Sequence, residues 1–288
     1  MSENIYGGMD QQTLDNAYNA GSAVPNYADW VERYEAASNE ALAAIPGPRD
    51  VPYGPHKDQV LDIFPAAQAG APVHLFIHGG YWRAFYKDRF ACAALGLQPA
   101  GATVMVNSYT LCPAVTIDVI VHQCRAAIAW IYRNAERHGA DPERIFISGH
   151  SAGGHLVAML MATDWAGDYG LPKDVIKGAT PISGLYDLDP IRHCYLQSDL
   201  HLDDAQVDRG SPVHQPPNHP CPVLPTYGGD ETQGFLDQWA AYEPVLKAAG
   251  SPYRFVDMPG HDHFSIFWEL TKQDSPLTQA ILEQMGLG

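Results

Sequence analysis

At residues 144–160 the chain reads Arg144-Ile145-Phe146-Ile147-Ser148-Gly149-His150-Ser151-Ala152-Gly153-Gly154-His155-Leu156-Val157-Ala158-Met159-Leu160. A short apolar run typical of a strand leads into a serine flanked by glycines, and apolar residues at helical spacing follow. Such a strand-to-helix elbow holds the serine in a strained backbone conformation and lifts its hydroxyl clear of the sheet edge. Gly149 and Gly153 flank Ser151 at positions where a side chain would collide across the turn. The stretch therefore predicts a nucleophilic serine at position 151.

Strands and helices alternate along the rest of the chain. This alternation predicts the α/β fold class, with one mainly parallel central sheet and helices on both of its faces. In such sheets the loops at the carboxyl ends of the strands form the functional site. The loops that follow predicted strands at that end and carry informative sequence are 78–82, 149–153, 228–231 and 259–263. The predicted strands are 60–64, 73–77, 103–106, the residues up to 150, 175–183, 223–227 and 253–258, and the predicted helices are 29–45, 88–97, 117–131 and 236–249.

The length of 288 residues fits a single domain of this class, residues 1–288. We expect residues 1–45 to form an N-terminal extension and a helix, with 1–28 wrapping the surface and Asp29 as the helix N-cap. Residues 190–222 lose their periodicity and gather prolines, so we expect an irregular, cap-like excursion there. Asp141-Pro142 is expected to turn the chain into the strand that follows.

The composition argues against several classes of partner. With 33 acidic and 17 basic residues the net charge is −16, which disfavours nucleic acid and anionic membrane surfaces. The N-terminus has no signal-peptide pattern, and no apolar run approaches the roughly 20 residues that span a bilayer. Five scattered cysteines without a Cys-x-x-Cys pair suit reduced thiols in a cytoplasm. We expect a cytoplasmic protein whose partner is a small-molecule substrate, and the sequence leaves open whether it forms a homo-oligomer.

The sequence also lacks the motifs of metal and cofactor sites. The 13 histidines include no His-Glu-x-x-His pair, and neither a P-loop nor a nicotinamide-binding glycine fingerprint is present. We therefore expect no metal and no cofactor.

A serine nucleophile needs a base to take its proton and a carboxylate to orient that base. In enzymes with this elbow the order along the chain is serine, acid, histidine. Asp230 or Glu231 follows one predicted strand, and His261 or His263 follows the next, so Ser151 has candidates for both partners in the required order. The residues alone leave the choice within each pair open, and Asp187, after the preceding predicted strand, is a third candidate for the acid that could instead cap a turn.

The loop His78-Gly79-Gly80-Tyr81-Trp82 is suited to stabilise the oxyanion that forms when a serine attacks a carbonyl. Paired glycines allow backbone N–H groups to turn toward the substrate, and the N–H at the start of the helix after Ser151 adds a further donor. We expect Gly80, Tyr81 and Ala152 to supply these donors, with Gly79 as the alternative.

Aromatic residues lie on or beside the same loops. Trp82, Tyr186 and Phe264 are candidates for the wall of a substrate pocket, although aromatic side chains at such positions commonly belong to the core. If they line a pocket, they favour an aromatic or flat apolar substrate.

These motifs resemble the α/β-hydrolase kynurenine formamidases, or arylformamidases, and their bacterial esterase-like relatives. The resemblance covers most of the chain and is carried by residues 61–65, 78–82, 149–155, 183–188 and 262–264. It implies the α/β-hydrolase fold and a serine hydrolase that converts N-formyl-L-kynurenine to formate and kynurenine in tryptophan breakdown.

The resemblance also implies a choice of base and acid. The histidine of the family precedes a phenylalanine, which implies His263 as the base. Its acid stands four residues before a phenylalanine that is followed, three residues on, by glutamine; Phe235 and Gln238 fit, and they imply Glu231. The alternative functions are a general carboxylesterase on short-chain or aromatic esters and a hydrolase-fold binding protein that does no chemistry.

Overall fold

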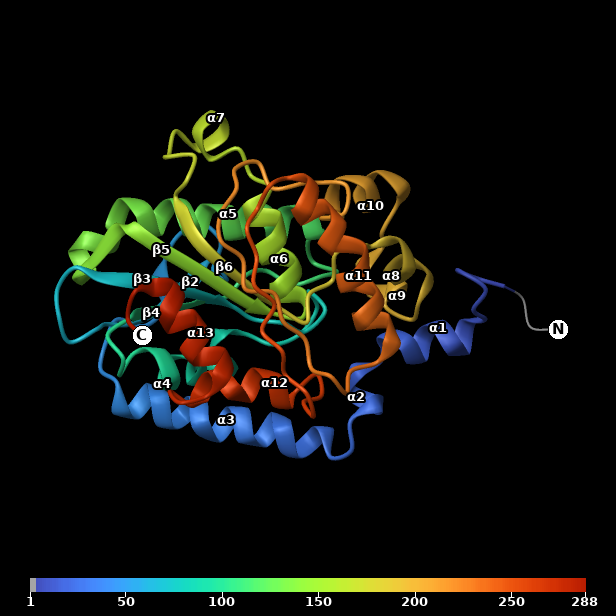
Figure 1. Cartoon of the computed structure of the whole chain (residues 1–288), viewed down its shortest axis with the longest axis horizontal. Coiled ribbons are helices and arrows are strands. Elements are labelled where there is room, and N and C mark those ends of the chain that lie inside the picture. Colours follow the sequence, from blue (N-terminus) through green and yellow to red (C-terminus); the bar gives the residue numbers. More distant parts are fainter. Residues whose placement is uncertain (1–3) are drawn as a thin grey trace.

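The computed structural model describes residues 4–288 and contains a six-stranded sheet of order β1-β2-β4-β3-β5-β6 (Figure 1). The strands are β1 (Val51–Pro52), β2 (Val60–Phe64), β3 (Ala71–Ile77), β4 (Thr103–Asn107), β5 (Ala140–His150) and β6 (Ile176–Ile182). From β4 to β6 all neighbouring strands are parallel, whereas β2 runs antiparallel to β1 and β4. The predicted mainly parallel sheet is confirmed.

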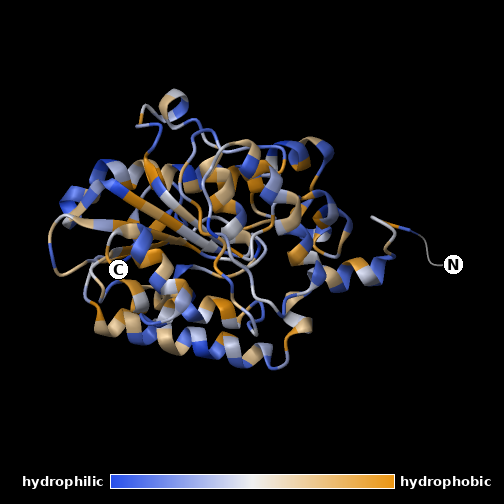
Figure 2. Cartoon of the chain, viewed as in Figure 1, coloured by the Kyte–Doolittle hydropathy of each residue, from blue (hydrophilic) through white to orange (hydrophobic). Residues whose placement is uncertain are grey.

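Helices cover both faces of this sheet (Figure 1). One face carries α5 (Ile117–Asn134), α6 (Ala152–Met161) and α11 (Gln233–Ala248), and the other carries α3 (Tyr27–Ala44), the 3-10 segment η1 (Lys87–Ala93), α4 (Ala94–Leu97), α12 (Ser265–Trp268) and α13 (Pro276–Met285). Successive side chains of a strand point to opposite faces. In β3, Leu75 therefore packs into the core between the sheet and α5, α6 and α11, which we call the first core. Phe76 packs into the core on the opposite face, which we call the second core. Figure 2 shows the apolar residues concentrated on the strands, as a sheet buried on both faces requires.

Two of the predicted strands continue the sheet as isolated bridges. Val223 and Thr226 bridge Ala179 and Ile182 of β6, and Val223 also bridges Tyr253. Prolines at 222, 225 and 252 provide no backbone N–H for a continuous ladder. The first segment nevertheless lies next to β6 and the second next to the first, through the Val223–Tyr253 and Gly228–Met258 bridges, so the loops after them follow the sheet edge that carries Ser151.

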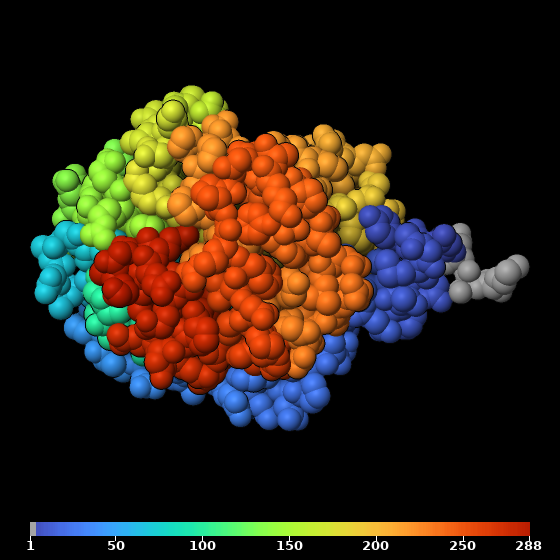
Figure 3. Space-filling view, viewed as in Figure 1, coloured from blue at the N-terminus to red at the C-terminus, as the bar shows by residue number. Residues whose placement is uncertain are grey.

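The N-terminal segment is more ordered than the sequence indicates. It contains α1 (Gln11–Tyr18) and α2 (Ala20–Ala23), and Leu14 and Tyr18 are buried in the first core. Figure 3 shows the segment lying against α11 and its neighbours. Residues 4–28 lie mostly on the surface, as the sequence predicts, but α1 and α2 and their buried residues are not predicted, because α1 is amphipathic over a length too short to be conspicuous; residues 1–3 lie outside the described part.

Three further expectations need correction. Helix α3 begins at Tyr27, after Asn26 in the left-handed conformation, so Asp29 lies in the first turn and is not the N-cap. Asp141-Pro142 belongs to β5, which pairs with β3 through a register shift after Pro72 and so accommodates the proline. The segment 190–222 is not irregular throughout, since it holds three short helices: α8 (Asp189–His193), α9 (Gln197–Leu200) and α10 (Asp204–Gly210).

All five cysteines are unpaired and buried. Burial raises the pKa of the Cys92, Cys112, Cys124 and Cys221 thiols to about 12 and that of Cys194 to about 11. Within residues 4–288, the helices are too short or too polar for any of them to cross a bilayer.

Candidate active site

The elbow around Ser151 has the geometry that its sequence predicts. Strand β5 ends at His150, Ser151 has φ 59° and ψ −120°, and α6 begins at the next residue. A Cβ on Gly149 would lie 2.4 Å from the Gly153 carbonyl oxygen, and one on Gly153 would lie 2.0 Å from that of Ile77. Glycine is therefore required on both sides. A positive φ on a serine is a strained conformation that persists only where the surroundings enforce it.

Glu231 and His263 form a buried pair next to this elbow. The Nδ1 atom of His263 donates to Glu231 Oε2 at 2.7 Å, and neither side chain is more than 6% exposed. The other carboxylate oxygen accepts the backbone N–H of Gly228 at 2.9 Å and the hydroxyl of Ser183. With the Nδ1 proton committed to the carboxylate, the Nε2 atom of neutral His263 is an acceptor.

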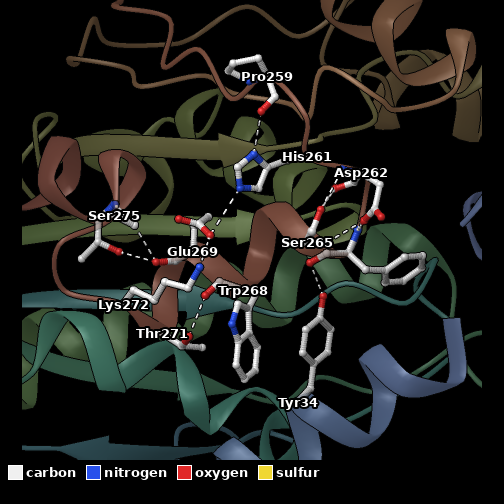
Figure 4. A network of polar contacts seen from close by, with 12 residues as sticks. Tyr34, Pro259, His261, Asp262, Ser265, Trp268, Glu269, Thr271, Lys272 and Ser275 are labelled. Atoms are coloured by element: carbon white, nitrogen blue, oxygen red, sulfur yellow. Dashed lines mark hydrogen bonds and ion pairs between the residues drawn. The ribbon is translucent and has the colours of Figure 1, made fainter. Parts of the chain in front are cut away.

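The alternative acid and base lie in a different environment. Asp230 is exposed. His261 donates from Nδ1 to the Pro259 carbonyl oxygen at 3.1 Å, and its Nε2 atom lies 3.4 Å from Glu269 (Figure 4). Lys272 pairs with the same Glu269 carboxylate at 2.6 Å. His261 is engaged in this separate network, whereas His263 pairs with Glu231 and lines the same pocket as Ser151, and neither Asp230 nor His261 lines that pocket.

The position of His263 is fixed by its neighbours. The carboxylate of Asp262 accepts the backbone N–H groups of Phe264 and Ser265 at 2.9 and 2.7 Å and so closes the turn into α12 (Figure 4). His150 donates from Nε2 to the His263 carbonyl oxygen at 2.7 Å, and the two rings lie 4.6 Å apart. Complete burial, together with the neighbouring His263, lowers the pKa of His150 well below its usual value, so His150 stays neutral.

The glycine loop after β3 approaches the serine closely. A Cβ on Gly79 would lie 2.7 Å from the His150 carbonyl oxygen and 3.1 Å from Ser151 Cβ. Within residues 4–288, the backbone N–H groups of Gly79, Gly80, Tyr81 and Ala152 have no hydrogen-bond acceptor. Unpaired backbone donors beside a serine can stabilise an oxyanion.

A pocket of about 240 Å³ opens over these groups. Ser151, His150, His263 and the loop residues Gly79–Tyr81 form its floor. The other lining residues, which we call the pocket wall, are Asn19, Ala20, Gly21, Tyr27, Val31, Tyr34, Arg83, Ala84, Phe85, Arg89, Phe90, Tyr195 and Phe264. The volume lies near the lower limit of ordinary ligand pockets, so the pocket suits a small substrate.

Two of the three predicted pocket aromatics lie elsewhere. Trp82 is fully buried and its indole N–H bonds His155 at 3.2 Å, while Tyr186 is buried in a stack on Tyr242 with ring centroids 4.4 Å apart. Both are core residues because their loops turn these side chains away from the pocket. Phe264 does line the pocket.

Sequence reasoning missed several residues of the site. Ser183, which donates to Glu231, has no motif of its own in the sequence, although it directly follows β6 at the same sheet edge. Tyr27, Tyr34 and Tyr195 come from segments without a motif, so no sequence signal marks them. Within residues 4–288, no group of three or more His, Cys, Asp or Glu side chains could hold a metal ion.

Comparisons with known proteins place these features in context. The BD-FAE family matches residues 61–174. The chain is 31% identical over 244 residues to a kynurenine formamidase of Danio rerio, covering 82% of this chain and 81% of that protein. It is 27% identical over 301 residues to the esterase LipQ of Mycobacterium tuberculosis, covering 91% and 71%. A crystal structure of a candidate thioesterase from a Silicibacter species superposes with a TM-score of 0.82 at 28% identity, covering 93% of this chain and 98% of that one.

Proposed function

Because this chain belongs to the kynurenine formamidase family and is a hydrolase of the α/β-hydrolase fold, we propose that it hydrolyses N-formyl-L-kynurenine to formate and kynurenine. The observation that carries this proposal is the buried Glu231–His263 hydrogen bond of 2.7 Å, whose histidine lines the same pocket as Ser151. A small-acyl aryl amide fits a small pocket with aromatic residues in its wall.

In the proposed mechanism, Ser151 is the nucleophile and His263 is the base. The Ser151 hydroxyl attacks the formyl carbonyl while His263 Nε2 takes its proton, and His263 then gives that proton to the leaving arylamine. Glu231 holds the Nδ1 proton and stabilises the imidazolium that forms. Water, deprotonated by the same histidine, attacks the formyl ester and releases formate and Ser151.

The oxyanion of each tetrahedral intermediate is bound by backbone N–H groups. We assign Gly80, Tyr81 and Ala152 as donors, and the assignment is supported because these N–H groups have no acceptor among the residues that the structure describes. Gly79 is the alternative donor on the same loop. Such donors act because they are oriented before the charge develops, which avoids reorganisation during the reaction.

A substrate comparison tests the proposal. Purified protein is assayed on N-formyl-L-kynurenine and on p-nitrophenyl acetate, and we expect kcat/KM for the formamide to be higher by at least about tenfold. A reversed preference would identify a carboxylesterase, the second candidate function, which the similarity to LipQ favours. A fluorophosphonate probe should label wild-type protein but not Ser151→Ala, and Ser151→Ala should lose at least about a thousandfold of activity. Absence of labelling and turnover would instead favour a binding protein without chemistry.

The remaining expectations from the sequence stay proposals. We propose a cytoplasmic, single-domain protein without a metal or cofactor. Buried, unpaired cysteines support a reducing compartment. Light scattering of the purified protein would measure whether copies of the chain associate.

A further inference from the structure

Two cations in the pocket wall have no part in the proposed reaction. Arg83 and Arg89 both line the pocket that Ser151 and His263 share. Among the described residues that line it, none is an aspartate or glutamate, although the chain has 33 acidic and only 17 basic residues. We propose that these arginines bind a carboxylate of the substrate, so that the pocket selects aryl amides or esters that carry an anionic group. The inference rests on the proposed function of this pocket and specifies its substrate class.

Arg83 is held in place and still has donors to offer. Its Nη1 atom donates to Asp199 in α9, and the guanidinium carbon lies 5.6 Å from the centroid of the Tyr195 ring. The side chain is 34% exposed. A guanidinium has five N–H donors, and Asp199 is the one hydrogen-bond acceptor that Arg83 has among the described residues. The other donors are free for a ligand.

Arg89 is arranged in the same manner from a different element. Its Nη2 atom lies 3.3 Å from Glu35 of α3, its guanidinium carbon lies 5.2 Å from the Phe85 ring centroid, and its side chain is 31% exposed. Each arginine is thus fixed by one carboxylate outside the pocket and one aromatic ring inside it. A substrate carboxylate could bind the remaining N–H groups without displacing either partner.

The backbone between the glycine loop and Arg89 is strained where it faces the pocket. Tyr81, Trp82 and Phe85 have φ of 48°, 58° and 74°, and the N–H groups of Arg83 and Ala84 fold back onto the Gly80 carbonyl oxygen at 3.1 and 3.0 Å. Such strain collects at ligand-binding segments. Its effect here is to bury Trp82 and to place Arg83 and Phe85 on the pocket.

The wall therefore combines a cationic and an aromatic part within one small volume. Phe85, Phe264 and Tyr27 suit the ring of a substrate, whereas the arginines suit a carboxylate, which a guanidinium can bind through two parallel N–H···O bonds. N-formyl-L-kynurenine carries both a ring and a carboxylate.

Substitution of the arginines tests the inference on a matched substrate pair. We compare N-formyl-L-kynurenine with its carboxamide, which keeps the ring, the formamide and the ammonium group but lacks the carboxylate. Arg83→Met and Arg89→Met should each raise KM for the carboxylate substrate about tenfold, because each removes charge-assisted hydrogen bonds to the carboxylate. KM for the carboxamide should stay within about twofold of the wild-type value. Arg254→Met is the control, because Arg254 pairs with Glu283 at 3.0 Å, is 60% exposed and lies outside the pocket.

The outcomes separate this inference from the proposed function. If the arginine variants keep the wild-type preference for the carboxylate substrate, or lose kcat/KM equally on both substrates, the arginine subsite is refuted while the formamidase activity stands. If neither formamide is hydrolysed, the proposed function fails, and the same variants are assayed on phenyl acetate and 4-acetoxybenzoate. Selective loss on the anionic ester would then still support the subsite, and an equal response would refute it.

Discussion

The sheet edge that carries Ser151 and the pocket wall that faces it are built in different ways. At the edge, Ser151, Glu231 and His263 are almost completely buried, and the Glu231 carboxylate accepts three hydrogen bonds. In the wall, Arg83 and Arg89 are about a third exposed and each has one carboxylate partner. The edge is held by backbone geometry and by the three hydrogen bonds of the Glu231 carboxylate, whereas Arg83 and Arg89 in the wall are each held by one carboxylate from a distant segment. We therefore expect substitutions at the edge to affect the chemical step and substitutions in the wall to affect substrate choice.

Three histidines in β3, in the loop after it and in α6 are buried without charge. Burial lowers the pKa of His74 to about 3 and that of His78 and His155 to about 4. The unfolded chain binds protons at these residues once the pH falls below about 6.5, and the folded chain does not, so each costs about 2 kcal/mol of unfolding free energy at pH 5. The contribution of each neutral histidine to the free energy of unfolding is fully present above pH 6.5 and is lost as the pH falls toward 4.

Urea unfolding at pH 7 and pH 5 measures this loss, which is the largest effect we expect. His155→Gln should reduce the difference between the two pH values by about 2 kcal/mol. The exposed His201 provides the control, since His201→Gln should leave the difference unchanged. Equal stability of the wild-type protein at both pH values would show that these histidines are not buried as neutral groups.

Replacing each of the two adjacent acids by its amide, one at a time, distinguishes the buried carboxylate from the exposed one. Glu231→Gln should lower kcat about a thousandfold, because an amide does not hold the Nδ1 proton of His263 or stabilise its imidazolium. Asp230→Asn should stay within about twofold of wild type, since Asp230 is exposed. Steady-state kinetics of both variants decide the point, and a larger loss for Asp230→Asn would reverse the assignment.

The glycine loop joins the edge to the wall. A Cβ on Gly80 would lie 2.3 Å from the Ala84 carbonyl oxygen, and its φ is 105°. Gly80→Ala should displace the oxyanion donors and lower kcat about a hundredfold. Gly139→Ala is the matched control: its φ is also positive, at 75°, but its Cβ would meet nothing within 4 Å. That variant should lose stability, measured by thermal unfolding, and keep its kcat.

The smallest effect is expected in the wall itself. Tyr27 lines the pocket and is 37% exposed, and the centroid of its ring lies 4.9 Å from that of the Phe264 ring. Tyr27→Ala should raise KM about threefold and leave kcat unchanged, because it removes binding common to ground and transition state. Tyr132→Ala on α5, outside the pocket, should change neither. A fall in kcat for Tyr27→Ala would show that the wall takes part in chemistry and would remove the distinction drawn above.

The same distinction decides what could be predicted from the sequence. Ser151 and its glycines form a local motif, and the mainly parallel sheet follows from the alternation of strands and helices, so both were predictable. Glu231 and His263 could be preferred over Asp230 and His261 only through the family resemblance, because two carboxylates or two imidazoles one or two residues apart in a loop differ in direction and not in chemistry. In the structure Glu231 is buried and Asp230 is exposed, so burial separates two acids that the sequence alone does not separate.

The wall could not be predicted because its residues meet only in the folded chain. Trp82 and Tyr186 stand on the right loops yet face the core, whereas Tyr27 and Tyr195 come from segments whose sequence shows no pattern. The sequence predicts an aromatic pocket, but of the three aromatic residues it indicates only Phe264 lines the pocket. Side-chain direction in a loop with several positive φ values does not follow the periodicity on which sequence patterns depend.

The burial of all five thiols has a practical consequence for studying the wall in solution. Maleimide dyes react with accessible thiolates, so the native cysteines should stay unmodified while the protein is folded. A single cysteine introduced at the exposed Val119 on α5, or at Tyr27 over the pocket, would then carry the only fluorophore. The emission of a dye at position 27, compared with one at position 119, would report ligand arrival at the pocket without a chromogenic reaction.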